Sequence, residues 1–111
     1  MKTLIAALLS VVFVLPASVS AATRLEVCEQ KLSIAQQNGI IHRMSVEKDG
    51  VHVVVDSGVW EQSPYTTKLG IAAVVECAIA GPENRLVGVI FRDSRTNKVV
   101  GRYRYPELKV E

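Results

Sequence analysis

The stretch IIHRMSVEKDGVHVVVD, residues 40–56, decides the fold because its pattern predicts a β-hairpin. Asp49-Gly50 is a dipeptide typical of a two-residue type I′ turn. Folding the chain about this turn sets Val46 opposite Val53 on an apolar face. On the other face it sets Glu47 opposite His52 and Arg43 opposite Asp56, as pairs of opposite charge. We therefore expect a sheet with one buried face and one face toward solvent.

The segments on either side of this hairpin both predict helices. Residues 23–39 place Cys28 and Leu32 on one helical stripe. Residues 63–80 begin with a serine suited to the N-cap and a proline suited to the first helical position, and Gly81 follows their end. This second helix is apolar on nearly every side. It must therefore be covered by the sheet and by the first helix, or by a second copy of the chain.

A second hairpin is predicted near the end of the chain. Residues 86–92 and 99–105 are rich in β-forming residues, and residues 93–98 supply the turn. Residues 107–111 are interpreted as a tail or a short edge extension. The resulting order predicts an α+β fold: an N-terminal helix, then ββαββ with a four-stranded antiparallel sheet packed against a central helix.

The first residues have the features of a signal peptide. Lys2 precedes an apolar run over residues 4–15, and small residues precede a predicted cleavage site after Ala21. We expect residues 1–21 to be a signal peptide and residues 22–111 to be one domain, exported to a periplasm or secreted. No later segment is long and apolar enough to predict a transmembrane helix.

The two cysteines, Cys28 and Cys77, are predicted to form an internal disulfide, because exported proteins meet an oxidising environment. Free or intermolecular thiols, a metal site and a catalytic thiol remain open as competing interpretations. Neither cysteine has the cysteine or histidine neighbours of a zinc site.

Charge and aromatic residues indicate one candidate binding surface. Thirteen basic residues against eleven acidic ones give no global charge that would draw the chain to nucleic acid. Locally, Arg92, Arg102 and Arg104 form a basic stripe on the second hairpin, with Tyr103 between two of them. This stripe is interpreted either as a solvated face or as a docking site for an acidic partner or an anionic polymer. Trp60 is either a residue that closes the core or an aromatic platform for a partner.

No pattern predicts catalysis or a cofactor. His42 and His52 are expected on opposite faces of the first hairpin, which argues against a two-histidine metal site there. No nucleophile motif in a suitable setting, glycine-rich phosphate loop or pair of carboxylates is found. We expect no enzyme activity, no metal and no cofactor.

The sequence thus favours an exported, non-catalytic interaction module that binds an unknown partner protein or anionic surface polymer through Arg92, Arg102, Arg104, Tyr103 and Trp60. A competing hypothesis is an inhibitor or immunity-type protein that blocks a secreted enzyme through a projecting loop, at residues 57–63 or 93–98. The sequence is also compatible with a small hydrolase and with a self-associating subunit.

Overall fold

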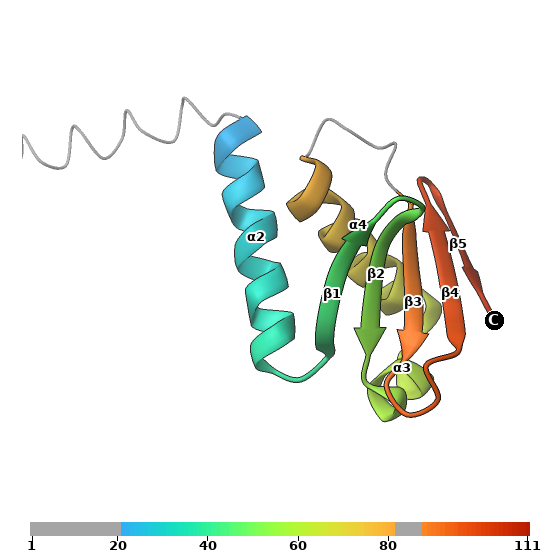
Figure 1. The fold of residues 1–111 in the computed structure, drawn as a ribbon. Helices are drawn as coiled ribbons and strands as arrows, with labels where there is room; N and C mark the ends of the chain where they lie inside the picture. Colours follow the sequence, from blue (N-terminus) through green and yellow to red (C-terminus); the bar gives the residue numbers. More distant parts are fainter. Residues whose placement is uncertain (1–20, 82–87) are drawn as a thin grey trace, which may run out of the picture.

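The computed structural model describes residues 21–81 and 88–111, and its fold is α+β (Figure 1). The predicted succession of helix, hairpin, helix and hairpin is confirmed. Residues 1–20 of the predicted signal peptide lie outside the described part of the chain. The elements are α2 Ala21–Gln37, β1 Ile41–Glu47, β2 Gly50–Val55, α3 Ser57–Gln62, α4 Tyr65–Ala80, β3 Val89–Asp93, β4 Val99–Arg104 and β5 Glu107–Val110.

The sheet has five strands in the order β1-β2-β3-β4-β5, and the neighbours β2 and β3 are parallel. The prediction of four strands, all antiparallel, is corrected on both points. The chain crosses over through α4 between β2 and β3, and such a crossover returns the chain to the end of the sheet from which β2 began. The fifth strand forms because the chain turns at residues 105–106 and Glu107–Val110 pairs with β4.

The helices form one layer against one face of the sheet. Figure 1 shows α4 behind the sheet and α2 beside α4, next to the β1 edge. The predicted disulfide is present: Cys28 of α2 is bonded to Cys77 of α4, with 5.9 Å between their Cα atoms. The cross-link therefore fixes α2, which lies at the edge of the sheet, to the helix that covers the sheet.

The core lies between α4 and the sheet face that α4 covers. Alternate residues of β2 point into it, because side chains of a strand alternate between the two faces. Val51, Val53 and Val55 are almost completely buried, as is Phe91 of β3. Trp60 of α3 stacks on Phe91 with 4.8 Å between the ring centroids. The short helix α3, in a segment that the sequence predicts to be a loop, thus closes one end of this core.

The first hairpin has the predicted faces but a different register. Val46 pairs with Val51 instead of Val53, so Lys48 and Asp49 form the two-residue turn. The shift is two residues, and an even shift leaves the side chains from Arg43 onward on their original faces. A bulge between Ile41 and Arg43 instead turns Ile41 to the buried face, opposite Val55. Gly50 joins the strand, where the amide of the next residue, Val51, donates to the Gly88 carbonyl at 2.8 Å.

Candidate functional site

The face of the sheet opposite α4, here called the open face, is not covered by any described helix (Figure 1). The strand register sets the side chains of this face in rows that run across the sheet. One row, here called the arginine row, consists of Arg43 on β1, Val54 on β2 and Arg92 on β3. Neighbouring strands lie about 4.8 Å apart, so the two arginines start about 10 Å from each other. The next row is Ser45, His52, Ile90, Arg102 and Lys109.

The floor of the open face is small and mostly covered. His52, Val54 and Ile90 are each exposed by less than a tenth, whereas Arg43 is exposed. Long basic side chains cover apolar surface with their stems and keep the charged ends in water. The open face therefore presents charged groups to a partner, and little free apolar surface.

Arg92 is held on the open face by two hydrogen bonds. Its Nε donates to His52 Nδ1 at 3.3 Å, and its Nη1 donates to the Asn97 carbonyl oxygen at 3.0 Å. A guanidinium has five N–H donors in a planar fork, and these two bonds use two of them. The remaining donors make no hydrogen bond within the described part of the chain. Arg92 also lines a cavity of about 420 Å³, together with residues that include Arg43, Glu47 and His52.

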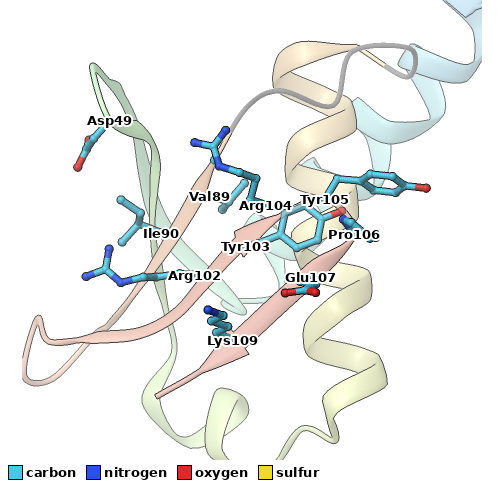
Figure 2. A pocket seen from close by; sticks show the side chains of 11 residues that line it. Asp49, Val89, Ile90, Arg102, Tyr103, Arg104, Tyr105, Pro106, Glu107 and Lys109 are labelled. Carbon is cyan, nitrogen blue, oxygen red and sulfur yellow. The ribbon is translucent and has the colours of Figure 1, made fainter.

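A second hollow lies at the other end of the open face, over β3, β4 and β5. Figure 2 shows this groove, whose volume is about 580 Å³, with the basic side chains of β4 and β5 around it. Its charged lining is mixed, because one acidic side chain comes from the turn of the first hairpin and another from the start of β5. The basic residues are Arg102, Arg104 and Lys109, and the acidic residues are Asp49 and Glu107.

The predicted arginines do share the open face, but their surroundings differ. Arg102 Nε lies 3.4 Å from a carboxylate oxygen of Glu111, and Arg104 is opposite Glu107 in the strand register. No carboxylate lies in the arginine row. The nearest carboxylates lie outside the row: Glu47 lines the same cavity as Arg43 and Arg92, and Asp49 interacts electrostatically with Arg92.

The two aromatic residues of the predicted binding set lie elsewhere. Tyr103 is 3% exposed, because it alternates with Arg102 and Arg104 along β4 and points to the other face of the sheet. It is nevertheless one of the residues that line the groove. Trp60 is 4% exposed and belongs to the core. The structure does not bring either ring to the open face, so neither takes part in the site described below.

Arg43 is the member of the site that sequence reasoning missed. The register expected from the sequence set Arg43 opposite Asp56, as one of several charge pairs. In the structure its partner in the sheet is Val54. Asp56 instead accepts hydrogen bonds from the Val59 backbone amide and from His42. These bonds hold the pKa of Asp56 below its ordinary value, with the bond from Val59 as the largest cause. A correct register would have been needed to find Arg43.

The two histidines bind different carboxylates. His42 Nε2 lies 3.1 Å from Asp56 Oδ1, and His52 Nε2 lies 2.7 Å from Asp49 Oδ1. Within residues 21–81 and 88–111 there is no cluster of three or more histidine, cysteine, aspartate or glutamate side chains that could hold a metal ion. The arrangement of the described charged groups suits binding of an anion by arginine.

Comparison with known proteins finds no matching family model, no similar curated protein and no similar solved structure. A separate search of the described helices finds none with the length and apolar character needed to cross a membrane.

Proposed function

We propose that this domain is an exported, non-catalytic interaction module that binds an acidic partner protein or an anionic surface polymer through the open face of its sheet. The observation that carries the proposal is the arginine row, in which two guanidinium groups flank Val54 with no carboxylate between them. Arg102 and Arg104 extend the positive charge toward the groove.

Arginine suits this task because its planar fork can donate two parallel hydrogen bonds to one carboxylate or phosphate. A single exposed ion pair contributes only about 0–1 kcal/mol. Useful affinity therefore requires several pairs, or arginines that are held in place before binding. Arg92 meets the second condition through its bonds to His52 and Asn97.

Export is part of the proposal and is supported by the disulfide between Cys28 and Cys77, since such bonds persist in oxidising compartments. The destination would be a periplasm or the cell exterior.

The inhibitor hypothesis receives less support. Residues 57–62 form α3 instead of a projecting loop, and the ring of Trp60 is buried. The turn at residues 93–98 is the remaining candidate for such a loop. The self-association hypothesis concerned an exposed apolar flank of the central helix. On α4 the large apolar side chains of Tyr65 and Ile79 are exposed, so this hypothesis stays a second prediction.

An affinity pull-down from periplasmic or culture extract tests the proposal. The mature protein is compared with a variant carrying Arg43→Gln and Arg92→Gln, and with a control carrying Lys31→Gln and Lys48→Gln. Both variants lose the same charge, but the control lysines lie outside the rows of the open face. We expect the arginine variant to lose a partner that the control retains, and added salt to weaken capture. Recovery of the same partners by all three proteins would refute the proposal.

A further inference from the structure

His52 occupies an unusual place for a titratable side chain on a solvent-facing sheet surface. It is only 9% exposed and lies on the floor of the open face, between Ser45 of β1 and Ile90 of β3. Its Nε2 is 2.7 Å from Asp49 Oδ1, while its Nδ1 is 3.3 Å from Arg92 Nε. The imidazole therefore connects the turn of the first hairpin to the arginine row.

The partners of His52 define its protonation state. An arginine Nε–H is always a donor, so Nδ1 must accept and carries no proton. Asp49 accepts, so Nε2 carries the single proton of a neutral ring. The hydrogen bond from His52 is also the largest cause that holds the pKa of Asp49 below its ordinary value, which keeps that group a carboxylate. The hydrogen bonds to Asp49 and Arg92 are thus both consistent with one neutral tautomer of His52, which carries its proton on Nε2.

We propose that His52 is a positioning residue: the neutral ring, oriented by Asp49, holds the guanidinium of Arg92 in place within the arginine row, and protonation of the ring releases it. This inference deepens the proposed function and rests on it, because it describes how the binding site is kept ordered and how acidification would loosen it. The ligand group that fits is a carboxylate or phosphate with two or more acceptor oxygens.

Protonation acts directly on the bond to Arg92. A doubly protonated imidazole has donors at both nitrogens, so Nδ1 could no longer accept from Arg92 Nε, and two cations would face each other. The other charged groups near the ring are Asp49 and Glu47, whose Oε2 is 3.9 Å from Nε2. Across Ile90, the next cation in the row is Arg102.

Nuclear magnetic resonance of the nitrogen-labelled protein tests the positioning role without any ligand. At about pH 7.5 we expect a protected Arg92 Nε–H signal and a His52 Nδ1 shift typical of an unprotonated nitrogen. At a pH low enough to protonate the ring, the Arg92 signal should fade, because Nδ1 then carries a proton and can no longer accept. Two variants serve as a matched pair. His52→Phe keeps a ring but no acceptor and should lose the Arg92 signal at both pH values. His52→Asn places an amide oxygen near the position of Nδ1 and should retain the signal at both.

The wild-type titration and His52→Asn keep the test decisive even if His52→Phe folds poorly. An Arg92 signal that is insensitive to pH and to both substitutions would overturn the positioning role.

A binding measurement with a polyglutamate peptide separates this inference from the proposed function. At about pH 7.5, His52→Phe should weaken peptide binding about two- to tenfold, the cost of ordering one side chain on binding, and His52→Asn should restore it. If Arg43→Gln with Arg92→Gln leaves peptide binding unchanged, the proposed function fails, while the positioning role stands on the resonance data. If that variant weakens binding but His52→Phe does not, the positioning role fails and the proposed function stands.

Discussion

Replacing Gly50 by alanine should be among the most damaging single substitutions on the surface of this protein. Gly50 has φ of +134°, a conformation that side chains rarely adopt, and a Cβ there would overlap the carbonyl oxygen of Gly88. That carbonyl accepts the hydrogen bond from Val51 at the start of the parallel pairing between β2 and β3. Backbone strain at residue 50, together with the forced separation of residues 50 and 88, should lower the free energy of unfolding by about 3 kcal/mol.

Two other glycines separate the contributions to this cost. Gly39 has φ of +75° and open space where a Cβ would lie, so Gly39→Ala incurs the cost of the left-handed conformation alone, about 1 kcal/mol. Gly70 lies inside α4 with ordinary φ and open space, so Gly70→Ala should stabilise the protein by about 0.5–1 kcal/mol through higher helix propensity. Gly50→Ala, which combines strain with overlap, should therefore destabilise the protein most. Gly39→Ala, which has strain alone, should destabilise it less, and Gly70→Ala, which has neither, should not destabilise it.

Thermal unfolding followed by circular dichroism, with the disulfide intact, measures the series. For a domain of this size we expect the Tm to fall by about 15 °C for Gly50→Ala and about 5 °C for Gly39→Ala, and to rise by about 4 °C for Gly70→Ala. If Gly50→Ala lowers the Tm no more than Gly39→Ala, the close approach of the hairpin to Gly88 does not exist, and the parallel pairing it accompanies is wrong.

Three further results are expected. Replacing Cys28 and Cys77 together by alanine opens a loop of 49 residues and should lower the unfolding free energy by up to about 4 kcal/mol, measured in urea; an unchanged midpoint would contradict this. The pKa of Asp93 is held below its ordinary value of 3.8, chiefly by the backbone amide of Thr96, so its stabilising contribution is complete above that pH and is lost as the pH falls below it. Asp93→Asn should flatten the fall in unfolding free energy below pH 3.8, and an equally steep fall would contradict that role. Trp60→Ala should cost about 3–5 kcal/mol, since the ring is buried in the core; a loss under about 1 kcal/mol would show that the ring is not packed there.

Local sequence signals accounted for much of the fold. The alternation in residues 40–56 correctly placed Val53 and Val55 on the buried face, because alternation depends only on which side each residue of a strand takes. It did not predict that Val46 on that face is exposed, or that Val54 on the other face is buried. Gly81 marked the end of α4 as expected, and Asn97 adopts φ of 61° in the turn between β3 and β4. The disulfide followed from the composition of the chain and the expected compartment.

The sequence by itself determined the two long helices, the two hairpins and the covalent link between those helices, because these depend on neighbouring residues and on only two cysteines. It did not determine α3 or the pairing of β5. Only the tertiary structure decided that β2 and β3 run parallel, that Arg43 joins Arg92 across Val54, and that His52 lies between Asp49 and Arg92. Each of these contacts joins different strands or turns, so it depends on strand order and register. Those are set by packing of the whole chain, including the crossover through α4, and no local pattern specifies them.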